Sequence, residues 1–244
     1  MLTDLNWIAT GQAFPPDEER ERLKAYKDEE FMFNGEYERV YGSYFSGLID
    51  NLRMRGASVQ TIINYPQLLT KKTADFVCSE PPGISAGEDT DVINDTLSNL
   101  TFNNTLYEAI MDISRFGNSV IKILEDRISI VPPEYWFPIV DPHDAKHVMA
   151  HVLAFISGNE IYVEIHDRGK YEIRYYELRT QKENKTEFEF GKLLNKEVVT
   201  TGINECAVQV LTNVTNSKNI YGISDYNIIK SVHRQLLWRL LPDI

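Results

Sequence analysis

Residues 106–140, LYEAIMDISRFGNSVIKILEDRISIVPPEYWFPIV, combine a helix that stops abruptly with three short strands. Apolar side chains three or four residues apart share one face of the predicted helix. These side chains are Leu106, Ile110, Ile113 and Phe116. We expect Asn103 and Asn104 to cap the start of this helix, and Gly117 to end it in the left-handed conformation that glycine adopts readily.

The residues after Gly117 are predicted to be extended. β-Branched and apolar residues dominate three short runs that turn residues separate. The runs are 119–124, 128–131 and 136–140. Asp126 and Arg127 form the first turn, and Pro132 and Pro133 interrupt the second strand because proline cannot donate a ladder hydrogen bond. Since the stretch includes no obvious catalytic group, we interpret it as a scaffold.

The composition is that of a globular protein with an acidic balance. The chain has 244 residues, 43% of them hydrophobic, which suffices for one large or two small domains with a real core. A net charge of −11 argues against a general nucleic-acid binder, which needs Lys and Arg to displace counterions from phosphates. The sequence contains neither a secretory signal nor a window of ~20 apolar residues that could span a membrane. Cys78 and Cys206 lack CxxC spacing, so we expect free thiols in a reducing compartment, with a disulfide as the alternative.

The N-terminal part is predicted to be helical after a short arm. Residues 1–16 form the arm, whose apolar side chains are expected to dock on another surface. These side chains are Trp7, Ile8 and Phe14. Helices are predicted over 17–33, 36–53, 67–78 and 92–100. Glu18 and Arg22 are expected to pair at i,i+4 in the first helix, and Pro66 suits the first turn of the third.

The second half of the chain is predicted to be rich in strands. Apolar runs separated by turn residues predict strands over 147–156, 161–165, 171–178, 188–190 and 207–211. Consecutive hairpins of this kind form an antiparallel sheet with one solvated face. A last helix, capped by Ser224 or Asp225, is expected to follow. The predicted fold class is α+β, with N-terminal helices packed on a mainly antiparallel β-sheet. We divide it into an N-terminal arm with helices, residues 1–56, and an α+β core, residues 57–244.

The sharpest enzyme-like pattern is a histidine repeat. His143, His147 and His151 lie four residues apart, and Asp144 follows the first. On a helix these side chains would share one face, where two histidines and a carboxylate could bind zinc. The residues from His147 onward are predicted to be a strand, however, in which the three rings would not converge. We therefore favour histidines satisfied on a sheet face, and keep a metal-dependent enzyme as one alternative.

Three acidic residues and a histidine lie within or directly beside the predicted strand 161–165. They could be interpreted as a catalytic site with a pair of acids and a base. The group comprises Glu160, Glu164, His166 and Asp167. Their alternation favours the exposed face of a sheet instead. The sequence contains no GxSxG, no GxxxxGK[ST] and no GxGxxG, so neither nucleophilic catalysis nor nucleotide binding has a motif here.

Aromatic side chains on the predicted sheet suggest a second alternative. Tyr171, Tyr175, Tyr176 and Phe188 could form a stacking platform for bases or sugars, which would make the sheet a tyrosine-rich ligand-binding module. Cross-strand packing is the simpler interpretation. We assign no catalytic, cofactor-binding or metal-binding residue, and we expect no cofactor.

Three segments, in their order and spacing, resemble a known family. The first is IINYPQLLTKKTADFVCSEPPGI, residues 62–84, in which an asparagine precedes a helix and a Glu-Pro-Pro loop follows it. The second comprises SRFGNSVIKI, residues 114–123, and WFPIVDP, residues 136–142. The third is NIYGISDYNIIKSV, residues 219–232. Together they resemble the N-terminal portion of tailed-bacteriophage portal proteins over most of residues 17–241.

The resemblance implies a structural protein and no enzyme. Portal proteins of this kind form rings, usually of twelve subunits, at one capsid vertex, where double-stranded DNA is packaged and ejected. The part resembled is the wing, an α+β domain that touches neighbouring subunits and the capsid. The implied partners are copies of the chain itself, the major capsid protein and scaffold, and passing DNA without sequence specificity; no membrane is implied. The implied location is the virion portal vertex, and the host cytoplasm during assembly.

The resemblance also implies regions that residues 1–244 do not contain. In the family a stem helix, a clip, a second stem helix and a tunnel loop follow the wing, and terminase and the head–tail connector bind there. We therefore expect a truncated chain or a fragment. On this hypothesis, apolar side chains outside the local core should lie on subunit contacts or on the face that the stem would cover. The side chains concerned are Trp7, Phe14 and Trp238.

Overall fold

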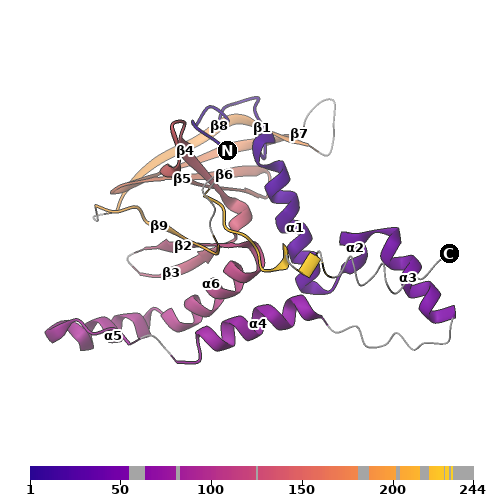
Figure 1. Cartoon of the computed structure of the whole chain (residues 1–244). Helices are drawn as coiled ribbons and strands as arrows, with labels where there is room; N and C mark the ends of the chain where they lie inside the picture. Colours follow the sequence, from indigo (N-terminus) through magenta and orange to yellow (C-terminus); the bar gives the residue numbers. More distant parts are fainter. Residues whose placement is uncertain are drawn as a thin grey trace.

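The computed structural model describes residues 1–54, 64–80, 83–124, 126–180, 187–201, 204–214, 220–227, 229, 230 and 232. They form an α+β fold in which a large curled sheet lies above a small sheet, with helices below and to the sides (Figure 1). No helix of the described residues is long and apolar enough to cross a membrane.

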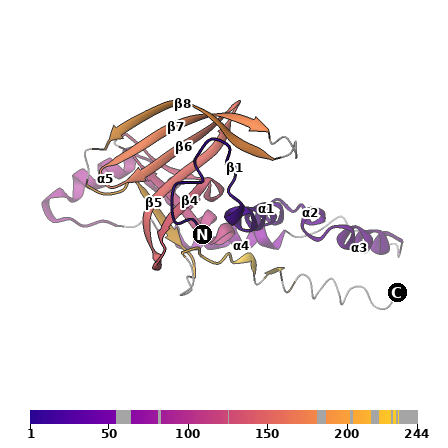
Figure 2. The ribbon, with the colours of Figure 1, turned by 90° about the horizontal axis from the view of Figure 1, so that it is seen from above.

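The large sheet has six strands in the order β1-β8-β7-β6-β5-β4, and all of its pairs are antiparallel. The strands are β1 (Ala13–Phe14), β4 (Trp136–Asp141), β5 (Asp144–Ser157), β6 (Glu160–Asp167), β7 (Lys170–Thr180) and β8 (Phe188–Thr200). Strands β5 to β8 follow one another as neighbours and curve together across the molecule (Figure 2). The predicted series of consecutive hairpins is confirmed.

The small sheet has three antiparallel strands in the order β3-β2-β9. These are β2 (Asn118–Ile123), β3 (Ile128–Val131) and β9 (Val208–Thr212). The hairpin β2–β3 is the one predicted after Gly117. Strand β9 is the predicted last strand, and it joins this hairpin from about 90 residues further along the chain instead of extending the large sheet.

Six α-helices lie within the described ranges: α1 (Arg20–Asn34), α2 (Tyr37–Tyr41), α3 (Ser43–Met54), α4 (Tyr65–Val77), α5 (Thr90–Asn99) and α6 (Phe102–Phe116). Helix α6 lies beneath the small sheet, and α4 packs below α6 (Figure 1). The predicted helix 36–53 is two helices, because Gly42 adopts a φ of +62° and breaks it.

Two further helix predictions need correction. Helix α6 starts at Phe102 after Thr101, so Asn103 and Asn104 lie within its first turn and do not cap it. In the N-terminal helix, Arg22 pairs with Glu19 at 2.6 Å and not with Glu18, because Glu19 is the acid that faces the core. Gly117 ends α6 with a φ of +78°, as predicted.

The N-terminal arm packs on the large sheet of its own chain. The amide of Gly11 donates to the carbonyl of Phe190 at 2.7 Å, and the amide of Val140 donates to the carbonyl of Leu2 at 2.9 Å. Apolar side chains of the arm enter the main core cluster, which lies on one face of the sheet. The cluster is formed by Leu2, Trp7, Ile8, Phe14, Phe137, Ile139, Val152, Ala154, Ile161, Val163, Ile165, Tyr176 and Phe190.

This packing corrects the expectation that the arm's aromatic residues contact another subunit. Trp7 is 8% exposed and Phe14 is 7% exposed, and their rings lie 6.0 and 5.4 Å from the ring of Phe190. The arm covers a sheet face that would otherwise be an exposed apolar surface, so the docking surface is intramolecular. Trp238 lies outside the described residues.

A second core cluster fills the space between the two sheets. It joins Trp136, Val140 and Leu153 of the large sheet to Val120 and Val208 of the small one. The small sheet thus covers part of the face of the large sheet that the sequence predicted to be solvated.

Candidate functional site

Segments far apart in the sequence meet at the C-terminal end of α6. The end of this helix, the loop after β9, residues 220–226 and the first turns of α4 all make direct contacts there. These segments include parts of all three sequence motifs that carry the family resemblance. We call this contact region the junction.

Two glycines allow the chain to pass itself at the junction. A Cβ atom on Gly222 would lie 1.9 Å from the carbonyl oxygen of Gly117 and 2.5 Å from that of Asn213. A Cβ atom on Gly117 would lie 2.6 Å from the carbonyl carbon of Gly222. Real Cβ atoms do not approach backbone so closely, so only glycine fits at either position. Gly117 needs glycine for a second reason, since its φ of +78° is left-handed.

Three hydrogen bonds from backbone amides connect the chain segments that cross at Gly117 and Gly222. The amide of Asn213 donates to the carbonyl of Gly117 at 2.8 Å, and the amide of Ile223 donates to the carbonyl of Asn213 at 3.0 Å. The amide of Gly222 donates to Oδ1 of Asn118 at 2.9 Å. These bonds satisfy backbone groups that the helix end and the loops would otherwise leave unpaired.

Asp225 and Ser224 connect the third motif to the second. One carboxylate oxygen of Asp225 accepts from Oγ of Ser114 at 2.8 Å, and the other accepts from Nδ2 of Asn213 at 2.9 Å. The hydroxyl of Ser224 donates to the carbonyl of Arg115 and accepts from the amide of Tyr226 at 3.0 Å. This last contact is an N-cap, so the predicted capping role of Ser224 is confirmed.

Tyr226 connects the same segment to α4. Its ring is fully buried, and its hydroxyl donates to the carbonyl of Pro66 at 3.0 Å and lies 2.6 Å from Oγ1 of Thr70. Burial raises the pKa of Tyr226 to about 12, so the phenol stays protonated and remains a donor. Asn64 caps α4 by accepting from the amide of Gln67 at 3.1 Å, and its Nδ2 donates to the carbonyl of Phe33 at the end of α1.

Side chains of helix α1 form hydrogen bonds with residues of the junction and of the large sheet. The hydroxyl of Tyr26 accepts from Nδ2 of Asn118 at 2.7 Å. The guanidinium of Arg22 donates to the carbonyl of Trp136 at 2.7 Å and to Glu19 at 2.6 Å, and Glu19 also accepts from the hydroxyl of Tyr221 at 2.9 Å. A buried charge that is paired and hydrogen-bonded in this way fixes α1, β4 and residue 221 relative to one another.

A second buried charge pair connects the two sheets. Nζ of Lys122 on β2 lies 2.7 and 2.6 Å from the two carboxylate oxygens of Glu164 on β6. Glu164 also accepts from the hydroxyl of Tyr162 at 2.5 Å and contacts Nε2 of His166 at 2.8 Å. Burial alone would raise the pKa of Glu164, but the hydrogen bonds from His166, Lys122 and Tyr162 lower it to about 2.

This arrangement corrects the prediction that Glu164 and His166 lie on an exposed sheet face. They are 5% and 0% exposed, because the small sheet covers them and Lys122 supplies the countercharge. Glu160 and Asp167 lie at the two ends of β6, apart from this pair. The four residues therefore do not form one acid–base site.

The structure separates the three histidines of the repeat. His151 is packed against Trp136, whose indole Nε1 donates to its Nδ1 at 3.1 Å, and burial lowers the pKa of His151 to about 4. His147 is exposed and lies 3.7 Å from Asp141, whereas His143 is in the preceding turn. Within the described ranges, no group of three or more His, Cys, Asp or Glu residues could hold a metal ion.

The tyrosines of the sheet are divided between its two faces. Tyr176 lies in the main core, where its ring is 5.0 Å from that of Phe190. Tyr175 packs on Tyr162 at 5.2 Å, and Tyr171 stacks on His166 at 4.9 Å, both on the other face. They make cross-strand and inter-sheet contacts, not one flat platform. Cys78 and Cys206 are both free, as predicted.

The comparisons with known proteins agree with the motifs that meet at the junction. Residues 17–231 match the family model described as "Phage portal protein, SPP1 Gp6-like". The chain belongs to this family of phage portal proteins. The match covers most of the chain and includes both glycines of the junction. None of the curated proteins compared with the chain matches it.

Portal proteins are structural, and the contacts at the junction and the two buried charge groups hold the fold of this one together. The sequence indicated Gly117, Gly222, Ser224 and Asp225 through turn and cap signals. It did not indicate that the pair of Arg22 and Glu19 is buried, and it did not indicate the pair of Lys122 and Glu164, because these partners lie on different sheets. A single basic residue among apolar neighbours, as Lys122 is among residues 120–124, is the signal that could have suggested the second.

Proposed function

We propose that this chain forms the wing of a portal subunit, one of a ring of copies at the capsid vertex through which double-stranded DNA is packaged and ejected. The observation that carries the proposal is the junction, where the three motifs matched within residues 17–231 contact one another through glycines, caps and buried hydrogen bonds. Such residues support a fixed shape and do not support a reaction.

The role of the junction in this proposal is mechanical. Residues 220–227, 229 and 230 are held on α6 by Ser224 and Asp225, on α4 by Tyr226, and on α1 by Lys230, whose Nζ lies 3.3 Å from Glu29. The position of the described residues between 220 and 230 is therefore set by several elements at once. A ring subunit needs such a constraint, because neighbouring copies can close a ring only if each has the same shape.

The proposed partners follow from this role. Copies of the chain form the ring, usually twelve in number, and the major capsid protein and scaffold surround it. Terminase and the head–tail connector bind stem and clip regions of the family. DNA passes without sequence-specific contacts, and the net charge of −11 favours passage over adhesion of a polyanion. The chain acts at the portal vertex of the virion, after assembly in the host cytoplasm, and has no enzymatic activity.

Electron microscopy of the negatively stained, purified chain tests the proposal. Closed rings of one size, with light scattering showing the same particle in solution, are expected. Gly158→Ala, at a hairpin turn with no atom within 4 Å of the added Cβ, is the control that should form the same rings. A chain that remains monomeric at every concentration, or that forms only a two-fold dimer, contradicts the proposal.

A further inference from the structure

Helix α5 forms an arm that projects from the body on the side opposite α2 and α3 (Figure 1 and Figure 2). None of its ten residues is buried, and Val92 is 67% exposed. An isolated helix shorter than ~12 residues is marginal in water, since nucleation costs more than a few hydrogen bonds recover. Contact with a partner surface would therefore stabilise the helix of this α5 arm.

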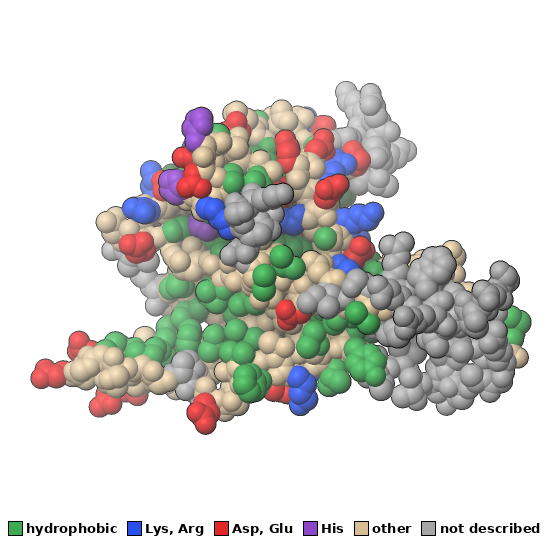
Figure 3. All heavy atoms as spheres, viewed as in Figure 1, with side chains coloured by type: hydrophobic (Ala, Val, Ile, Leu, Met, Phe, Trp, Pro, Cys, Tyr) green, Lys and Arg blue, Asp and Glu red, His purple; other side chains and the backbone are tan. Residues whose placement is uncertain are grey.

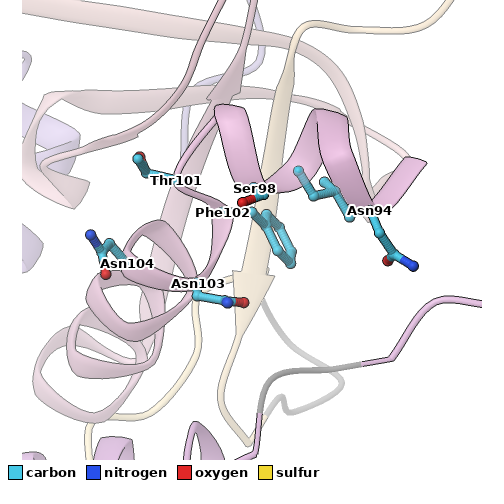
Figure 4. A pocket seen from close by; sticks show the side chains of 7 residues that line it. Asn94, Ser98, Thr101, Phe102, Asn103 and Asn104 are labelled. Carbon is cyan, nitrogen blue, oxygen red and sulfur yellow. The ribbon is translucent and has the colours of Figure 1, made fainter. Parts of the chain in front are cut away.

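The α5 arm, as distinct from the N-terminal arm, contacts the rest of the fold mainly through α6. Thr101 has a φ of +53° and turns the chain sharply from α5 into α6. A notch of about 360 Å³ lies beside this turn, lined by residues of both helices. Figure 4 shows Ser98 and Phe102 at the centre of this notch, with Asn94 further out along α5. Val92 and Asp95, three residues apart on another side of α5, are both exposed.

The charge of the arm restricts what it can bind. From Gly87 to Asn99, which comprise a short 3-10 helix and α5 itself, the sequence has four acidic residues and no Lys or Arg. Figure 3 shows acidic side chains at the outer end of α5 and hydrophobic ones along its inner part. Two arms of this kind placed against each other would bring like charges together, so a symmetric contact between arms is disfavoured. The partner surface should be apolar with a positive charge.

Helix α4 presents such a surface. Its buried positions are Pro66, Thr70 and Ala74. The opposite stripe carries exposed apolar side chains with Lys72, 70% exposed, among them. These apolar side chains are Tyr65, Leu68, Leu69 and Phe76, with exposures of 55%, 46%, 38% and 83%. Exposed apolar residues gathered on one stripe mark an interaction surface.

We propose that the α5 arm of one copy of this chain docks on the α4 stripe of the next copy. Val92 then contacts the apolar stripe near Leu69, and Asp95 lies close to Lys72. The two surfaces differ, so the contact is head-to-tail, and its repetition around an axis generates a ring. This inference rests on the proposed function and identifies the surfaces through which copies associate.

Disulfide cross-linking of a double variant, Leu69→Cys with Val92→Cys, tests the contact. Each subunit carries both cysteines, so a head-to-tail contact should give a ladder of linked species on a non-reducing gel after mild oxidation. The single variants, which retain Cys78 and Cys206, are the matched controls and should give no ladder. A lone dimer band from Val92→Cys would instead show a symmetric contact and overturn the proposal.

Charge reversal gives an independent readout. Lys72→Glu and Asp95→Lys should each weaken association up to about fivefold, the effect expected for an exposed ion pair, and the two together should restore it. Asp75→Asn controls for the intrachain pair of Lys72 and Asp75, at 3.3 Å, and should leave association unchanged. Equal losses in the single and double variants would overturn the pairing.

The outcomes for this inference and for the proposed function are distinguishable. Rings that form without a ladder from the double variant contradict the α5–α4 contact and leave the portal role intact. Absence of any assembly by the wild-type chain, together with absence of the ladder, contradicts both.

Discussion

Gly222→Ala adds one methyl group at the closest backbone approach in the junction, and it should destabilise the fold severely. The new Cβ would lie 1.9 Å from the carbonyl oxygen of Gly117, so the two backbone segments must separate by more than 1 Å. The φ of Gly222 is not in the left-handed region, so the substitution tests steric fit without a conformational penalty.

The magnitude follows from the contacts that separation would break. Forcing an extra methyl group into a packed site costs ~1–3 kcal/mol. The bonds from the amides of Asn213, Ile223 and Gly222 weaken at the same time, and each contributes ~0.5–1.5 kcal/mol. We expect a loss of about 3–5 kcal/mol, a large fraction of the ~5–15 kcal/mol by which a domain is stable.

Urea unfolding followed by tryptophan fluorescence measures this loss, and two other glycines provide matched controls. Gly158→Ala has a φ of +60° but open space around the Cβ, so it should cost only about 1–2 kcal/mol. Gly47→Ala, within α3 and also in open space, should stabilise by up to about 1 kcal/mol. If Gly222→Ala is no more destabilising than Gly158→Ala, the reasoning about the junction is refuted.

Three further perturbations address the buried groups. Lys122→Ala should lower the free energy of unfolding in urea by ~3–5 kcal/mol, because it leaves Glu164 buried without its countercharge. The control Arg179→Ala, at an exposed ion pair, should lower it by less than about 1 kcal/mol. Equal losses would contradict this expectation. Trp7→Ala should destabilise a monomeric sample by ~3–5 kcal/mol, and a neutral effect there would mean that Trp7 is not a core residue. Burial raises the pKa of Asp112 from 3.8 to about 7, so the folded state binds more protons between these values and stability falls as pH rises through them. Asp112→Asn should therefore flatten the stability profile between pH 4 and 7, and an unchanged slope would contradict the assignment.

Local signals predicted much of the architecture. The hairpins at Gly158 and Gly169 and the helix end at Gly117 were found because each depends on turn residues and a change of period within a few positions. The N-cap at Ser224 was found for the same reason. The start of α6 was misplaced because Thr101, a β-branched residue, takes the left-handed conformation that asparagine would take more readily.

Contacts between distant residues could not be predicted in the same way. The arm around Trp7 was expected to bind another subunit, since nothing in its sequence indicates the sheet that it covers. The small sheet pairs β9 with β2, from the hairpin after Gly117, and it buries Glu164 of β6. The alternation of polar and apolar residues along β6 is otherwise typical of a strand with one solvated face. Pairing of this kind depends on tertiary packing, which periodicity does not record.

Native mass spectrometry of the purified wild-type chain tests the central claim most directly, because it counts subunits in each particle. A portal subunit should give one predominant assembly whose mass is a fixed multiple of 28.1 kDa, twelve if the ring has the usual size. The same multiple should persist as the concentration rises. A spectrum that contains only the 28.1 kDa monomer, or an open series with no preferred multiple, would contradict the claim that this fold is a ring subunit.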